Sequence, residues 1–299
     1  MNLNHLAVFY AVAEEGSVTR AANRLHISQP AVSKQLRDLE KSVGAALFHR
    51  LSTGVRLTDA GELLHGYARQ MFALEDEAQS ALRQLRALER GRLRVGASTL
   101  IADYVLPRVC ARFHRAHPGV ELRMEVVNSR EVARRLKNNA IEVALVDGPD
   151  EWADLHSDVW GDDALVAIAP PEHPLTRKPL TPQELSRAPL CAPLLLREEG
   201  SGVRAGVEAW LFPEGQPARA VSLGSHEAIR RAVVQGMGVA VLPARVVESD
   251  LQGGQLVALD ITGGSPHHPL RRLRVPGSYE SRAAREFWRL LRAGEKEAT

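Results

Sequence analysis

The residues best suited to a chemical task are hydrogen-bonding and cationic side chains near the amino end. Gln29, Ser33 and Arg37 follow one another at intervals of four residues, so a helix would carry them on one face. Pro30 and Lys34 lie beside them. Two hydrogen-bonding side chains, two cations and an apolar ring suit the major groove of DNA, where base edges offer donors, acceptors and thymine methyls. The alternative is a solvated helix face with no partner.

The elements that must position these side chains are two short helices joined by a tight turn, predicted within residues 18–37. Ser17 and Ser28 each precede a helix and can accept a hydrogen bond from one of its free N–H groups. Pro30 falls in the first turn of the second helix, where its missing N–H does no harm. The apolar residues of that helix recur at spacings of four, three and four, which predicts a buried stripe: Val32, Leu36, Leu39 and Val43. The pair favours a helix-turn-helix that reads DNA, with Ser28 at the edge of the contact.

Charge and a hairpin signal extend this interpretation. Residues 1–58 contain seven Lys and Arg against four acidic residues, so they carry a cationic excess that phosphate contact requires. Short apolar runs on either side of Gly54 predict a two-stranded wing that carries Arg50 and Arg56. Either arginine could contact phosphates or enter a minor groove, or could be an ordinary surface charge.

Residues 59–90 predict one long helix, capped by Thr58 or Asp59 and ended by Gly91. Apolar side chains alternate spacings of four and three along it, which is the pattern of a coiled-coil seam. Packing onto the next domain of the same chain is one explanation, and the strict repeat favours a second copy of the same helix. Dimerisation would also supply the two recognition helices that two DNA half-sites need. The predicted dimer contacts are Leu64, Tyr67, Met71, Leu74 and Leu85, within a seam that also includes Ala60, Ala78, Ala81 and Leu88.

From residue 91 onward, apolar strands alternate with amphipathic helices, which predicts a parallel sheet with crossover helices. We expect two α/β lobes in residues 91–299. Lobe I would comprise residues 91–162 and 267–299, and lobe II residues 163–266. A ligand of such sheets sits beyond the carboxyl ends of the strands, at helix N-termini.

The segments at those strand ends are rich in hydroxyls and small residues, which favours an anion or a polyhydroxy compound as the ligand. For any one of them the alternative is an ordinary helix cap. Arg204 could add a cation to the site or could simply be exposed. The predicted ligand contacts are Ser98, Thr99, Asn128, Ser129, Asp147, Gly200, Ser201, Gly202 and Ser225.

Residues 21–33, 36–40, 47–48 and 57–61 resemble LysR-type transcriptional regulators, whose pattern runs through the first 60 residues. The resemblance implies an α+β multidomain protein: a winged helix-turn-helix, a long dimerisation helix and a two-lobed effector domain similar to periplasmic binding proteins. In that family the residues matching Gln29, Pro30, Ser33 and Lys34 meet bases and backbone, while the wing lies in the minor groove. Family members form tetramers as dimers of dimers, so we expect self-association, double-stranded DNA and a small effector as partners, with RNA polymerase as a further one.

Two segments, residues 196–204 and 224–229, bear on the chemical class of the effector. They are similar to a branch of the family whose members sense inorganic sulfur anions or carbon-fixation metabolites. Members of this branch often have Pro or Gly where Glu199 stands, and an acid there weakens the comparison.

Composition and motifs exclude several other classes. Apolar residues make up 44% and charged residues 25% of the 299 residues, as in a soluble globular protein. Neither a secretion signal nor a membrane-spanning run is evident, so a cytoplasmic location is expected. Cys110 and Cys191 are expected to be core thiols. We find no catalytic constellation, metal site or cofactor motif, and expect no enzyme. A binding protein or enzyme with a vestigial DNA module, and an architectural DNA binder with an empty cleft, stay as alternatives.

Overall fold

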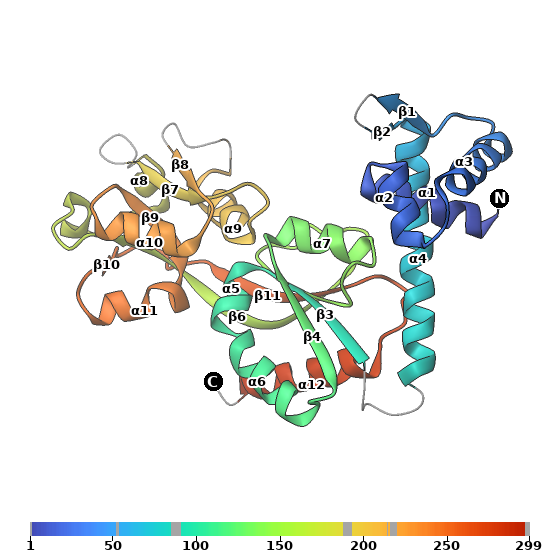
Figure 1. The fold of residues 1–299 in the computed structure, drawn as a ribbon. Coiled ribbons are helices and arrows are strands. Elements are labelled where there is room, and N and C mark those ends of the chain that lie inside the picture. The colour runs from blue at the N-terminus through green and yellow to red at the C-terminus, as the bar shows by residue number, and fades with distance from the viewer. Residues whose placement is uncertain are drawn as a thin grey trace. The chain divides into compact units, whose positions relative to one another are not determined.

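The computed structural model describes residues 2–51, 54–84, 91–187, 193–213, 215 and 220–296. The chain forms two compact units, Met1–Ser80 and Ala81–Thr299. Figure 1 shows α1 to α3 in dark blue, α4 in light blue to cyan, and the larger α/β unit in blue-green to red. Because α4 begins in the first unit and ends just beyond its boundary, it is described with the first unit.

The first unit is a small helical domain with a two-stranded wing. Its elements are α1 (Leu3–Glu15), α2 (Val18–Leu25), α3 (Gln29–Val43), β1 (Phe48–Leu51), β2 (Gly54–Leu57) and α4 (Asp59–Gln84). The predicted caps are confirmed, since Ser17 Oγ accepts from Arg20 N and Ser28 Oγ accepts from Ala31 N, both at 3.4 Å. Thr58 Oγ1 accepts from Gly61 N at 3.0 Å, so Thr58 caps α4. Helices α2, α3 and α4 therefore begin where a hydroxyl side chain satisfies a free N–H, and α1 begins where the amide oxygen of Asn2 does so.

The core of this unit holds α3 in place through the predicted stripe, of which Val32, Leu36 and Leu39 are buried. Val43 was expected in the same stripe and is 41% exposed, because it lies in the last turn before Gly44 ends the helix in a left-handed conformation. The wing is tied to α1 by a hydrogen bond from Val55 N to Gly16 O at 3.1 Å. The core thus fixes both the recognition helix and the wing on one small scaffold.

Helix α4 carries apolar residues on two faces rather than along one seam. One face packs onto its own domain core and contains Leu64, Ala68 and Phe72. The other face is exposed; we call it the α4 stripe, and it consists of Leu63, Tyr67, Met71 and Leu74. Leu64 therefore leans toward its own domain, and Leu63, which was not predicted, joins the stripe. The predicted contact Leu85 lies outside the described residues.

The second unit is built on one mixed sheet with the strand order β4-β3-β5-β11-β6-β9-β7-β8, and β10 pairs with β6. The strands are β3 (Gly91–Ala97), β4 (Val120–Val126), β5 (Val143–Asp147), β6 (His156–Ala169), β7 (Leu194–Arg197), β8 (Ala220–Leu223), β9 (Val239–Pro243), β10 (Val257–Ala258) and β11 (His267–Arg274). The helices are α5 (Thr99–Tyr104), α6 (Leu106–Ala116), α7 (Ser129–Lys137), η1 (Pro174–Arg177), α8 (Pro182–Arg187), α9 (Gly202–Leu211), α10 (His226–Val234), α11 (Ala244–Gln252) and α12 (Arg282–Lys296).

The expectation of a parallel sheet is only partly right. Strands β4, β3 and β5 are parallel, as are β8, β7 and β9, whereas β6 and β11 run antiparallel to their neighbours. Strand β6 is longer than predicted: it pairs with β11 from His156 to Ala164 and with β9 from Leu165 to Ile168. These two strands join two parallel sets into two lobes, as Figure 1 shows.

The two lobes touch where α9 begins. A Cβ at Gly202 would overlap the carbonyl of Asp147, and a Cβ at Gly148 would lie 2.7 Å from Gly202 O. Only glycine permits this approach of backbone to backbone.

Replacing Gly202 with Ala should therefore push the lobes apart or strain their contact. Overpacking of this kind costs about 1–3 kcal/mol, so we expect the melting temperature of the second unit to fall by several degrees in calorimetry. The matched control is Gly224→Ala, whose Cβ would meet nothing within 4 Å and whose backbone has no positive φ. Equal melting temperatures for the two variants would contradict the close contact.

Candidate functional site

The first candidate surface is the outer face of α3, opposite its buried stripe. Four of the predicted DNA contacts on it are exposed and Ser33 is half-buried, while Ser28 is exposed at the helix start; the exposed four are Gln29, Pro30, Lys34 and Arg37. The structure thus brings all the predicted contacts of this helix onto one accessible face. Because α3 is anchored through its apolar side, these side chains are presented on a rigid element.

The cations of this unit differ in whether they are already paired. Arg20 and Arg24 lie 3.7 and 3.2 Å from carboxylate oxygens of Glu15. Within the described part of the unit, Lys34, Arg37 and the exposed wing residue Arg56 form no ion pair. The backbone of Arg50 lies in β1, and its side chain is outside the described residues. Lys34, Arg37 and Arg56, which the sequence predicted for DNA, are thus free of an ion pair within the described residues of this unit.

In the second unit, several predicted ligand contacts serve as helix caps. Asn128 Oδ1 accepts from Glu131 N at 3.0 Å, Ser201 Oγ from Arg204 N at 3.5 Å, and Ser225 Oγ from Ala228 N at 3.0 Å. In each of these three residues, a side-chain oxygen is therefore used to cap a helix, which is the alternative that the sequence left open. Ser98 differs, since its side chain makes no cap hydrogen bond and is buried near Asp147, whose pKa it helps to lower.

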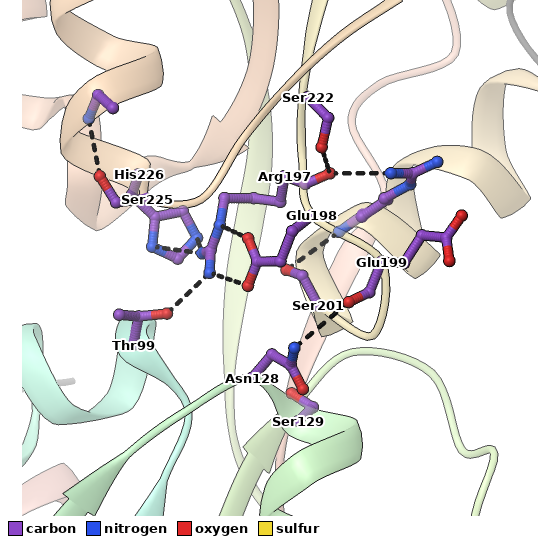
Figure 2. Close-up of polar contacts among 12 residues, drawn as sticks. Thr99, Asn128, Ser129, Arg197, Glu198, Glu199, Ser201, Ser222, Ser225 and His226 are labelled. Carbon is purple, nitrogen blue, oxygen red and sulfur yellow. Dashed lines mark hydrogen bonds and ion pairs between the residues drawn. The ribbon is translucent and has the colours of Figure 1, made fainter.

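The centre of the second unit is Arg197, which ends β7 and was not predicted as a site residue. Its side chain is only 3% exposed. In Figure 2 the guanidinium reaches across from the lobe of β7 to Thr99, whose Oγ1 accepts from Nη2 at 3.0 Å. Its Nη1 lies 2.6 Å from Nε2 of His226. Glu198 accepts a pair of hydrogen bonds, from Nε at 2.8 Å and from Nη2 at 2.9 Å.

The backbone of Arg197 is held as firmly as its side chain. Its carbonyl accepts from Arg204 Nη1 at 3.2 Å and from Ser222 Oγ at 3.3 Å. Arg204 also pairs with Glu208 at 2.7 Å, so its charge is already balanced within its own helix. Arg204, which the sequence offered as a cation for the ligand site, thus helps to position Arg197.

The imidazole of His226 is neutral in this environment. Burial, together with the positive charge of Arg197, lowers the pKa of His226 to about 3. A neutral ring can accept a hydrogen bond from the guanidinium and adds no charge of its own. The positive charge at this point of the molecule therefore comes from Arg197.

A second buried polar group, the pair of Asp147 and His268, lies next to the contact between the lobes at Gly202. Asp147 Oδ2 is 2.7 Å from His268 Nε2, and both side chains are buried. Burial raises the pKa of Asp147, but the hydrogen bond and charge of His268 outweigh it and lower the pKa to about 2. Ser129 Oγ donates to Asp147 at 3.3 Å. These predicted contacts are thus engaged with each other.

A cavity of about 420 Å³ lies beside this contact, between α7 and α9. Among the predicted contacts, five line it: Ser129, Asp147, Gly200, Ser201 and Gly202. Arg197, Thr99 and His226 do not, so the structure divides the predicted site into two places. Charges of both signs surround the cavity, including Arg130 and Glu199. The cavity therefore offers an anion less than the buried guanidinium does.

Two other kinds of site find no support among the described residues. No group of three His, Cys, Asp or Glu side chains there could hold a metal ion. Within the same ranges, no helix combines the length and apolar character needed to cross a bilayer.

Comparisons with known proteins match both units. Residues 3–62 match the sequence model of the bacterial regulatory helix-turn-helix proteins of the lysR family, and residues 86–296 match that of the LysR substrate binding domain. The RuBisCO operon transcriptional regulator of Allochromatium vinosum is 36% identical over 265 residues, covering 88% of this chain and 86% of its own.

Two solved structures agree with the fold. Full-length OxyR from Pseudomonas aeruginosa has a TM-score of 0.69 at 26% identity and covers 98% of this chain and 94% of its own. The CcmR regulatory domain of Synechocystis PCC6803, solved in complex with 2-PG, has a TM-score of 0.59 at 29% identity and covers 68% of this chain and 97% of its own. The chain belongs to the LysR family of bacterial transcriptional regulators, which bind DNA and are not enzymes.

Proposed function

We propose that this regulator responds to a small molecule carrying an oxyanion, which binds at Arg197 between the two lobes. The observation that carries the proposal is a guanidinium that is 3% exposed and hydrogen-bonds to Thr99 of the opposite lobe. The fork of an arginine matches carboxylate, sulfate and phosphate groups. The similar CcmR domain was solved with a small molecule, 2-PG, which supports an effector in this unit.

The division of labour along the chain follows the predicted boundaries. Residues 1–58 read double-stranded DNA, residues 59–90 mediate dimerisation, and residues 91–299 bind the effector in lobes I and II. Gln29 and Ser33 read base edges with the ring of Pro30, while Lys34, Arg37 and the wing arginines meet phosphates. Sequence-specific binding to DNA and contact with RNA polymerase would occur in the cytoplasm.

Self-association is supported by the α4 stripe. Tyr67 and Leu74 are each 60% exposed on a helix of 26 residues, and an apolar stripe on such a helix is buried by a partner. A second copy of α4 would cover it, which gives a dimer with two recognition helices. Tetramers would form as dimers of dimers, as the family resemblance implies.

Changing Gln29 or Ser33 to Ala should relax the preference for particular sequences, because each removes hydrogen bonds to base edges worth about 1–3 kcal/mol. Arg56→Gln should weaken binding to all duplexes alike and lower the salt dependence by about one phosphate contact. Fluorescence anisotropy with operator and scrambled duplexes at several salt concentrations measures both effects. Arg24→Gln is the control, since Arg24 is paired with Glu15. Identical behaviour of both kinds of variant would contradict this division.

Leu74→Glu should convert the protein to a monomer at micromolar concentration, because two copies of the stripe would bring two buried carboxylates together. Sedimentation equilibrium measures the change. The control is Val43→Glu, which places the same charge at another exposed apolar residue of the same unit. A dimer that survives Leu74→Glu as well as Val43→Glu does would show that the stripe is not the interface.

Sulfate should bind to the wild-type protein and raise its melting temperature by mass action. Arg197→Gln should weaken this binding at least tenfold, since a charge-assisted hydrogen bond contributes about 1.5–3 kcal/mol. The affinity should stay constant between pH 6 and pH 8, because His226, with a pKa of about 3, is neutral throughout and sulfate keeps its charge.

The control for this titration is Arg130→Gln, which removes a cation that lines the cavity. If Arg130→Gln abolished sulfate binding and Arg197→Gln did not, the anion would occupy the cavity and the proposal would be wrong. If no anion raised the melting temperature, the architectural alternative would be favoured.

A further inference from the structure

We propose that Glu198 occupies the place of the effector's oxyanion and acts as a built-in competitor for Arg197; this rests on the proposed function. The carboxylate of Glu198 takes two hydrogen bonds from the fork of Arg197, at 2.8 and 2.9 Å. A carboxylate, sulfate or phosphate group of a ligand would bind the same two N–H groups. Figure 2 shows the pair, with Thr99 and His226 on the other side of the guanidinium.

The remaining contacts of the guanidinium cannot replace Glu198 as a counter-ion. Thr99 offers a hydroxyl and His226 a neutral ring. Asp103 lies close enough that Arg197 lowers the pKa of its carboxyl, against the larger raising effect of burial, but it makes no direct hydrogen bond with Arg197 among the described contacts. Without Glu198 or a ligand, a buried cation would lose its hydrogen-bonded anion, which is unfavourable.

Arg197 and Glu198 differ in how far they are buried, and this difference makes Glu198 the partner that a ligand would displace. The side chain of Glu198 is 32% exposed, and Arg197 is its only side-chain partner in the described part of the chain. A displaced carboxylate could therefore enter water at little cost. The guanidinium is held by Thr99 and His226 and is almost fully buried. Exchange of one anion for another is thus the easier change, with the cation fixed in position.

Competition from Glu198 limits the chemical class of ligand that can bind to Arg197. A carboxylate tethered to the neighbouring residue competes at an effective concentration of about millimolar or higher. A free carboxylate offers the fork nothing that Glu198 does not, so it binds weakly. A sulfate or phosphate group has two charges and further oxygens, one of which can accept from the Thr99 hydroxyl beside the same guanidinium. Glu198 therefore selects tetrahedral dianions over carboxylates.

The test measures sulfate and acetate binding to the full-length protein by calorimetry. Glu198→Gln removes the charge and keeps one acceptor oxygen, and it should lower the Kd for sulfate by about tenfold and make acetate binding measurable. Glu198→Ala is a second variant that leaves no acceptor. The control is Glu199→Gln, which removes a neighbouring exposed charge that makes no hydrogen bond to Arg197 in the described structure. General charge repulsion would make the control equal to Glu198→Gln.

Arg197→Gln combined with Glu198→Gln separates this proposal from the proposed function. The gain from Glu198→Gln should disappear in the double variant, because the competition exists only while the fork is present. Sulfate binding that is equal in wild type, Glu198→Gln and Glu199→Gln, but lost in Arg197→Gln, would overturn the competitor and leave the proposed function standing. Absence of sulfate binding in wild type and in both Glu198 variants would overturn both.

Discussion

The second unit depends on the burial of one guanidinium. Arg197 is taken out of water at the end of β7, and a buried charge is tolerated only where an opposite charge and hydrogen bonds compensate for lost hydration. Its hydrogen-bond partners come from the lobe of β7 and, through Thr99, from the opposite lobe. An anion that bound there would change the interactions that hold the lobes together. A ligand shifts such a balance by its differential affinity for the two arrangements.

The lobes can respond because only two strands join them continuously. Strands β6 and β11 cross from one parallel set to the other, and noncovalent contacts add to this link. They include the backbone contact at Gly202, the Asp147–His268 pair and hydrogen bonds such as that from Arg197 to Thr99. A close backbone contact is sensitive to small displacements, since a packed interface has few intermediate arrangements. A change of anion at Arg197 would therefore be felt at the same interface that Gly202 closes.

Local signals predicted the DNA-facing elements well, and the effector site less well. Ser17 and Ser28 were correctly predicted as helix caps, because a cap hydrogen bond joins residues that are close together in the sequence. The same logic found Asn128, Ser201 and Ser225, which cap helices, but it could not tell a cap from a ligand contact because both share one residue pattern. Arg197 was missed because its burial is decided by Thr99 and His226, which are far away in sequence; an arginine directly after three leucines was the available signal. The antiparallel strands were missed because pairing direction is a tertiary property.

The α4 stripe and the cations of α3 both favour DNA binding by two copies of the chain. Affinity for duplex DNA grows with the number of phosphates that a protein neutralises, and each counter-ion released adds to it. With Arg20 and Arg24 paired to Glu15, one copy of the first unit offers few free cations beside its base-reading face. Two copies double that number and double the bases read. Burial of the α4 stripe would therefore supply the specificity that one short helix lacks, and each copy would bring its own anion site.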